Sequence, residues 1–225
     1  SLPPAMYKIK STARLLRRLA RAVWRQSMPS AGLQAIMIKA VILDFYGVIQ
    51  TDNLLLWVDH HNLTNPSFKQ TFDDICRRLD MDEINLDEYY NELADAVHRP
   101  VEVVRAELAA EVVINHDLLA IVDQLRSNGI KVAILSNDGS SLRAYISDLG
   151  LTDYFDLIVV SAEVRIMKPD ARIYQHAAHL LDLPVEECIF FDDRQTNVDG
   201  ALRAGMQSQL FTSNAQVRNI LNSLV

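Results

Sequence analysis

Short runs of consecutive apolar residues alternate along this chain with longer stretches in which apolar residues recur every three or four positions. The short runs are rich in Val and Ile and end at polar residues, which is typical of parallel strands buried on both faces. The longer stretches predict amphipathic helices. We expect strands over residues 38–43, 130–135, 157–160 and 188–191, a weaker strand over 209–211, and helices over 117–128, 140–149, 171–181, 197–204 and 215–224.

This alternation predicts an α/β fold. A strand, a helix and a second strand in succession form a right-handed crossover, and repeated crossovers build a parallel sheet with helices on both faces. Gly129 and Gly150 follow two of the predicted helices, where a C-terminal cap is expected. The sequence therefore predicts a Rossmann-like parallel sheet covered on both sides.

The segment 52–116 interrupts the alternation. It contains no convincing strand, but its apolar spacing predicts helices over 68–79, 86–98 and 100–111. Its size suits a small α-helical cap inserted after the first strand. We therefore expect a core domain made of residues 37–51 and 117–225, and a cap made of residues 52–116.

Charge sets residues 1–36 apart from the rest of the chain. They contain seven Lys or Arg and no Asp or Glu, which leaves 15 basic residues against 29 acidic residues elsewhere. The pattern of residues 12–26 predicts a basic amphipathic helix. One interpretation is a helix that contacts a membrane surface or a partner, and the other is an extension packed on a neighbour. The acidic remainder argues against nucleic-acid binding.

The composition is that of a globular protein, with 49% hydrophobic and 23% charged residues. No apolar run reaches the roughly 18 residues that a membrane span needs. Cys76 and Cys188 are far apart and lack metal-ligand spacing, which favours two thiols in a reducing cytoplasm.

Polar residues whose side chains can take part in catalysis or binding follow the ends of the predicted strands. Ligands bind at the carboxyl ends of the strands in open parallel sheets, so these residues would converge. Taken singly, each is an ordinary turn former, helix cap or surface residue. Two adjacent acids after a buried run repel each other, which indicates a cation such as Mg²⁺. The residues are Asp44, Ser136, Asn137, Lys168, Asp192 and Asp193.

The chemistry that this set supports is phosphoryl transfer. The carboxylate of Asp44 can attack phosphorus and form an aspartyl-phosphate. Lys168 and Mg²⁺ would neutralise the charge on the phosphate, while the hydroxyl of Ser136 would hold its oxygens.

The order of these motifs resembles the haloacid dehalogenase superfamily. The resemblance runs from about Ile38 to Leu210, with a helical cap after the first motif as in subfamily I. Residues 168–204 are especially similar to small sugar-phosphate phosphatases and to the N-terminal domains of epoxide hydrolases. The resemblance implies Asp44 and Lys168 as catalytic residues; Ser136, Asn137 and Lys168 as phosphate-binding residues; and Asp44, Tyr46 through its carbonyl, Asp192 and Asp193 as magnesium ligands.

One position departs from the pattern of phosphatases in this family. They usually carry a second Asp two residues after the nucleophile, which serves as general acid and then as general base. Here that position is Tyr46. A phenol with a pKa of about 10 is a poor base at neutral pH. Loss of a positioned acid/base costs on the order of 10²–10⁴ in rate.

Three hypotheses follow from this departure. The favoured one is a magnesium-dependent phosphatase that acts on a small phosphorylated metabolite such as a sugar phosphate. It would use a good leaving group or a proton donor from the cap. The second is a 2-haloacid dehalogenase, since those enzymes carry Asp-x-Tyr-Gly here, but Asp192 and Asp193 count against it because dehalogenases need no Mg²⁺. The third is a catalytically weak binding protein.

Overall fold

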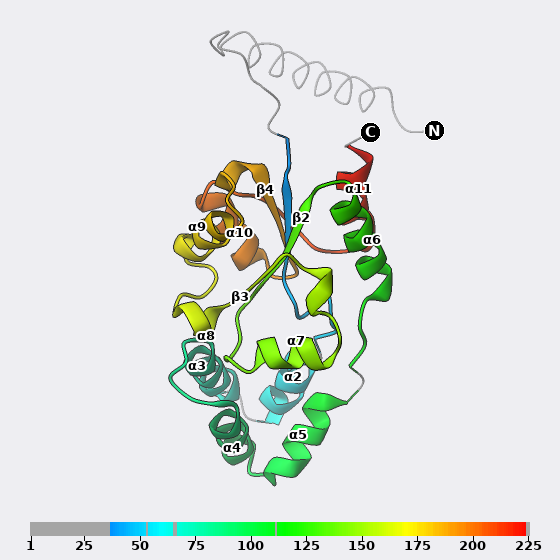
Figure 1. Cartoon of the computed structure of the whole chain (residues 1–225). Helices are drawn as coiled ribbons and strands as arrows, with labels where there is room; N and C mark the ends of the chain where they lie inside the picture. Colours follow the sequence, from blue (N-terminus) through cyan, green and yellow to red (C-terminus); the bar gives the residue numbers. More distant parts are fainter. Residues whose placement is uncertain (1–36, 53, 65–66, 111, 224–225) are drawn as a thin grey trace, which may run out of the picture. The chain divides into compact units, whose positions relative to one another are not determined.

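The sheet at the centre of this computed structural model has five strands in the order β3-β2-β1-β4-β5 (Figure 1). Every neighbouring pair is parallel. This confirms the predicted α/β architecture. The strands are β1 (Ala40–Leu43), β2 (Lys131–Ser136), β3 (Leu157–Val160), β4 (Cys188–Asp192) and β5 (Gln207–Leu210).

The structure describes residues 37–52, 54–64, 67–110 and 112–223, which all belong to one structural unit. The basic helix predicted over residues 12–26 lies outside the described residues.

Helices cover both faces of the sheet, and successive strand residues point into two different cores. Val41 and Leu43 of β1 belong to the cluster beneath α6, α7 and α11, whereas Ala40 and Ile42 belong to the cluster beneath α9 and α10. Both clusters exclude water, so the central strand β1, which contributes to both, is apolar throughout. The helices are α6 (His116–Ser127), α7 (Leu142–Asp148), α8 (Ser161–Val164), α9 (Ala171–Leu180), α10 (Gln195–Arg203) and α11 (Asn214–Asn222), with 3₁₀ turns η1 (Thr152–Tyr154) and η2 (Val185–Glu187).

Four helices lie between β1 and α6 in the chain, and we refer to them as the cap. They share a separate hydrophobic cluster that includes Trp57, Phe68 and Leu93. The first of them was not predicted, because its apolar residues stand side by side in the sequence instead of three or four apart. They are α2 (Leu54–Thr64), α3 (Phe68–Asp80), α4 (Leu86–Val97) and α5 (Val101–Ala109).

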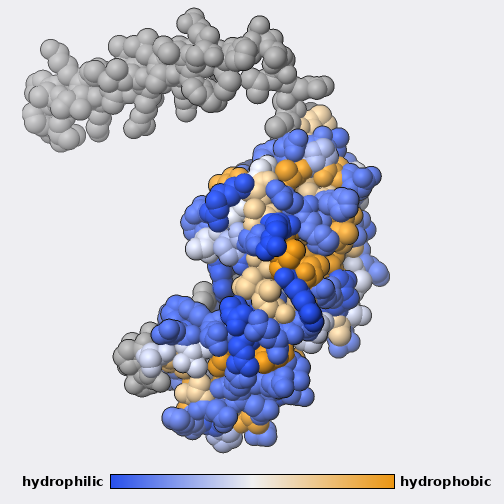
Figure 2. Space-filling model, turned by 90° about the vertical axis from the view of Figure 1, so that its left-hand side faces the viewer, coloured by the Kyte–Doolittle hydropathy of each residue, from blue (hydrophilic) through white to orange (hydrophobic). Residues whose placement is uncertain are grey.

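The surface of the described part is mostly hydrophilic in the view of Figure 2, with hydrophobic residues gathered in a few patches. Among the described helices, none is both long enough and apolar enough to cross a membrane. Cys76 and Cys188 are both unbridged thiols.

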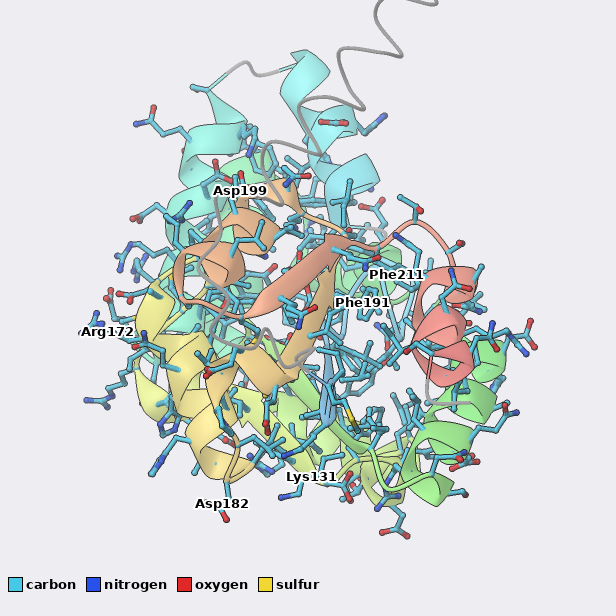
Figure 3. The ribbon with its side chains drawn as sticks, turned by 90° about the horizontal axis from the view of Figure 1, so that it is seen from above. Lys131, Arg172, Asp182, Phe191, Asp199 and Phe211 are labelled. Atoms are coloured by element: carbon cyan, nitrogen blue, oxygen red, sulfur yellow. The ribbon has the colours of Figure 1, made fainter. Side chains whose placement is uncertain are left out.

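The predicted starts of two strands are wrong by two residues, and two other strands differ by a single residue at their ends. The first strand begins at Ala40 instead of residue 38, and the last covers Gln207–Leu210 instead of 209–211. The edge strand β5 is polar and only partly buried, so its sequence carries a weak strand signal. Phe211 lies beyond the strand and packs against the core cluster that contains Phe191, and the two residues lie near each other in Figure 3.

Candidate active site

The carboxyl ends of β1, β2 and β4 meet at the edge of the sheet that faces the cap (Figure 1). Ser136 and Asp192 are the last residues of β2 and β4, and Asp44 directly follows β1. Because β1 lies between β2 and β4, the strand order alone brings these three side chains together.

Lys168 lies between two of these strand ends, with its side chain almost fully buried. Its Nζ donates a hydrogen bond to Oδ2 of Asp192 at 2.7 Å and forms an ion pair with Oδ1 of Asp44 at 2.9 Å. The side-chain amide of Asn137 accepts a hydrogen bond from the Lys168 N–H at 2.8 Å and donates one to the Lys168 carbonyl at 2.9 Å. Asn137 therefore positions the lysine, and its contact with a phosphate stays a prediction.

Three carboxylates lie close together at this sheet edge, and two of them contact Lys168. Asp44, Asp192 and Asp193 each offer an oxygen, and these oxygens all lie within 4.8 Å of one another. The single ammonium of Lys168 cannot offset three negative charges. Carboxylate oxygens at this spacing are the donors that a hard divalent cation such as Mg²⁺ prefers, so the residues fit such an ion.

Asp44 and Asp192 differ in proton affinity. Loss of hydration raises the pKa of Asp44 well above its ordinary value; the charge of Lys168 opposes this rise and that of Asp192 adds to it. Loss of hydration also acts on Asp192, but Lys168 and several hydrogen bonds lower its pKa overall. One of those bonds comes from the Arg194 N–H at 2.8 Å. Asn197 Nδ2 also donates hydrogen bonds to the two oxygens of Asp192, at 3.1 and 3.0 Å.

The same neighbours act on the pKa of Lys168. Loss of hydration disfavours its charged form, but the carboxylates of Asp44 and Asp192 raise the pKa overall. Lys168 is therefore a permanent cation at neutral pH.

Gly47 allows the loop after β1 to approach Asp193 closely. A Cβ at this position would lie 2.3 Å from Oδ2 of Asp193, and the backbone has a positive φ of +75°. Glycine meets both conditions, since it has no Cβ and adopts positive φ without strain. A side chain here would displace Asp193 from the other two carboxylates.

The hydroxyl of Ser136 is buried at the same edge without a hydrogen-bond partner among the described residues. Buried polar atoms nearly always have a partner, and the exceptions cluster at functional sites. A hydroxyl that can donate, at the sheet edge that also carries a buried ammonium, suits an anionic oxygen such as that of a phosphate.

Tyr46 is tied to a buried acid that sequence reasoning missed. Its phenol donates a hydrogen bond to Oδ2 of Asp138 at 2.8 Å, and the N–H of Gly139 donates one to Oδ1 at 2.6 Å. Loss of hydration and the charge of Asp138 raise the pKa of Tyr46 well above its ordinary value. Loss of hydration raises the pKa of Asp138 to about 6, against the lowering effect of these hydrogen bonds. The sequence signal that could have identified Asp138 is its position two residues after Ser136, near the end of β2.

Two ion pairs join the core to the cap, and neither was predicted. Arg194, which follows the acidic pair, lies 3.2 Å from Asp52 at the start of the cap segment. Arg165 lies 3.0 Å from Asp82, just after α3. Because the partners are more than 80 residues apart in the chain, local sequence gives no signal for either pair.

Comparison with known proteins identifies the family. Residues 38–205 match the family model of haloacid dehalogenase-like hydrolases. A phosphatase of Mycobacterium tuberculosis is 32% identical over 120 residues, which cover 52% of this chain and 55% of that protein. The chain thus spans about half the length of this relative. A phosphorylated carbohydrates phosphatase of Thermotoga maritima is 24% identical over 181 residues, which cover 75% of this chain and 82% of that protein.

Solved structures share the fold. An enzyme of the same family from Bacteroides thetaiotaomicron, in complex with magnesium and inorganic phosphate, has a TM-score of 0.64 and 19% identity over 78% of this chain and 94% of its own. The L-2-haloacid dehalogenase of Xanthobacter autotrophicus, with chloropropionic acid covalently bound, has a TM-score of 0.58 and 22% identity over 83% of each chain.

Proposed function

This chain belongs to the family of haloacid dehalogenase-like hydrolases, and from that premise we propose that it is a magnesium-dependent phosphatase of a small phosphorylated metabolite such as a sugar phosphate. The observation that carries the proposal is the cluster of Asp44, Asp192 and Asp193 around the single ammonium of Lys168. A phosphate monoester brings further negative charge to this cluster, so its binding requires more positive charge than Lys168 supplies.

Asp44 is the proposed nucleophile. Its carboxylate attacks phosphorus and forms an aspartyl-phosphate, which water then hydrolyses. Lys168 and the hydroxyl of Ser136 hold the oxygens of the phosphate where negative charge develops. Mg²⁺, held by Asp44, Asp192, Asp193 and the carbonyl of Tyr46, would neutralise charge on the phosphate when bound.

The comparisons support the substrate class. The relative from Thermotoga maritima is named for phosphorylated carbohydrates, and the fold neighbour from Bacteroides thetaiotaomicron was solved with magnesium and phosphate. Both names describe those proteins. Together with the three carboxylates, they favour a phosphorylated metabolite over other substrates for this chain.

A dehalogenase is the second candidate, because Tyr46 stands where those enzymes carry Tyr and because a dehalogenase shares the fold. A halide leaves without a proton, so that reaction needs no acid at position 46. It also needs no metal, which would leave the cluster of Asp192 and Asp193 without a function. A catalytically weak binding protein is the third candidate.

The test is release of phosphate from a panel of sugar phosphates, with Mg²⁺ and after its removal by a chelator. We expect turnover only with the metal, and a loss of at least about 10³-fold in kcat for Asp44→Asn, because the amide cannot act as the nucleophile. Asp199→Asn is the matched control. Asp199 is an exposed acid on the outer side of α10 (Figure 3), so wild-type rates are expected.

Metal-independent release of chloride from 2-chloropropionate, without turnover of any phosphate ester, would establish the dehalogenase instead. Turnover of neither substrate class would favour the binding protein.

A further inference from the structure

Position 46 offers no proton to a leaving group. The phenol hydrogen of Tyr46 is donated to Asp138, and both carboxylate oxygens of Asp138 already accept hydrogen bonds. Neither group is therefore placed to give a proton to an alcohol oxygen and to recover it from water. The acid of the proposed reaction has to come from another element.

The C-terminal end of α3 is the part of the cap that packs against the loop carrying Asp138. A Cβ built on Gly139 would lie only 2.7 Å from Cδ1 of Leu79, so the helix end lies directly against this loop. The ion pair of Asp82 with Arg165 ties the same helix end to the core. Figure 1 shows α3 beside α8, at the sheet edge where the site lies.

Asp80 is the last residue of α3, between these two contacts. It is partly buried, and its pKa responds to the charges of Asp138, Lys168 and Arg194 and to no hydrogen bond. These three residues belong to three different core loops around the site. Among the described residues no donor holds the Asp80 carboxyl group, and the charge of the lysine that contacts the nucleophile acts on it.

The surroundings of Asp80 favour its protonated form. Loss of hydration and the charge of Asp138 raise its pKa to about 7, while Lys168 and Arg194 oppose the rise. On its own helix the neighbouring titratable group is the thiol of Cys76, whose pKa is itself raised by burial. A general acid that later serves as general base works best with a pKa near the operating pH.

We propose that Asp80, carried by the cap, is the general acid and base of the reaction, in place of the acid that position 46 lacks. This inference rests on the proposed phosphatase function. It also makes closure of the cap over the core a condition of catalysis, because the nucleophile follows β1 and the acid is the last residue of α3.

The two chemical steps balance as follows. Asp44 forms a bond to phosphorus while the bond from phosphorus to the alcohol oxygen breaks. That oxygen keeps the electron pair of the broken bond and takes the proton of Asp80. Water then attacks the aspartyl-phosphate and gives a proton to the Asp80 carboxylate. The bond from Asp44 to phosphorus breaks, which releases phosphate and restores the nucleophile and the protonated acid.

The experiment compares wild type with Asp80→Asn on two esters, glucose 6-phosphate and 2,4-dinitrophenyl phosphate. An alkoxide needs a proton to leave, whereas dinitrophenolate does not. We expect kcat for glucose 6-phosphate to fall by about 10²–10⁴-fold in the variant. With the dinitrophenyl ester, the variant should release a rapid burst of dinitrophenolate and then turn over slowly, because the aspartyl-phosphate lacks its base.

Asp74→Asn is the matched control, since Asp74 lies on an exposed face of the same helix, and it should behave as wild type. A variant that keeps kcat for glucose 6-phosphate within about threefold would overturn the inference and leave the phosphatase function standing. Loss of the burst in a variant with a wild-type melting curve would also overturn it. If wild type hydrolyses neither ester, the proposed function is wrong and the inference falls with it.

Discussion

At the scale of single residues, the unpartnered hydroxyl of Ser136 lowers the stability of the folded protein. A buried polar group without a partner destabilises a protein by about 1–3 kcal/mol. We therefore expect Ser136→Ala to raise the free energy of unfolding of the ligand-free protein by about 1 kcal/mol. The same variant should gain less stability than wild type from inorganic phosphate with Mg²⁺. Urea unfolding with and without these ligands measures both effects.

Ser208→Ala serves as the control for this variant. The hydroxyl of Ser208 donates a hydrogen bond to the carbonyl of Phe190 at 3.1 Å, so its removal should lower stability and leave the effect of phosphate unchanged. If Ser136→Ala lost stability as Ser208→Ala does, the hydroxyl of Ser136 would have a partner in solution.

The residues that sequence reasoning found and those that it missed differ in how they reach the site. Asp44, Ser136 and Asp192 follow or end strands, so the predicted sheet was enough to bring them together. The carboxyl group of Asp138 stands at such a position too, but an acid in a turn is ordinary. The end of α3, which carries the proposed acid Asp80, lies against the loop after β2 only through packing of the cap, which no local pattern encodes.

At the scale of elements, α4 begins with a capping box. The side chain of Asn85 accepts hydrogen bonds from the N–H groups of Asp87 and Glu88 at 2.9 and 3.0 Å, and Glu88 accepts one from the Asn85 N–H at 2.8 Å. Loss of such a cap typically costs about 1 kcal/mol. We expect Asn85→Ala to lower the free energy of unfolding by about that amount in urea titrations.

Asn91→Ala is the control within the same helix. Asn91 is an exposed position inside α4, where Ala has the higher helix propensity, so this substitution should be neutral or slightly stabilising. Equal losses for both variants would mean that the cap geometry of Asn85 contributes nothing.

Helices and buried strands could be predicted where the spacing of apolar residues within the element itself indicates the structure. The helices around the sheet repeat their apolar residues on one face, and their predicted ranges overlap the observed ones. The polar edge strand β5 is held by its ladder with β4 and by the side chain of Ser208, which depend on partners elsewhere in the chain. Its bounds could therefore not be read from its own residues.

At the scale of the whole molecule, the raised pKa of Asp80 links stability to pH. Its pKa is about 7 in the folded protein, against an ordinary value of 3.8 for the unfolded chain. Between these values the folded state holds a proton that the unfolded state has released. Stability from this residue is therefore lost as the pH rises from about 4 to about 7, and it stays lost above that range.

Asp80→Asn removes this titration. The difference in free energy of unfolding between the variant and wild type should grow in favour of the variant from pH 4 to pH 7 and then remain constant. Urea unfolding without Mg²⁺ at several pH values measures it, with Asp74→Asn expected to follow wild type. A difference that does not change with pH would show that Asp80 titrates normally.

During synthesis, β1 emerges first of all the strands, yet it occupies the centre of the sheet between β2 and β4. Its partners begin at Lys131 and Cys188, so β1 can be paired on both edges only after the ribosome has passed Cys188. The four cap helices are made in the interval and have a hydrophobic cluster of their own. Domains generally fold as units while the chain is made, so we expect a nascent chain that ends before β4 to hold a folded cap beside an unpaired, aggregation-prone strand edge. The nucleophile would then gain its lysine and its acidic partners together, once synthesis has passed β4.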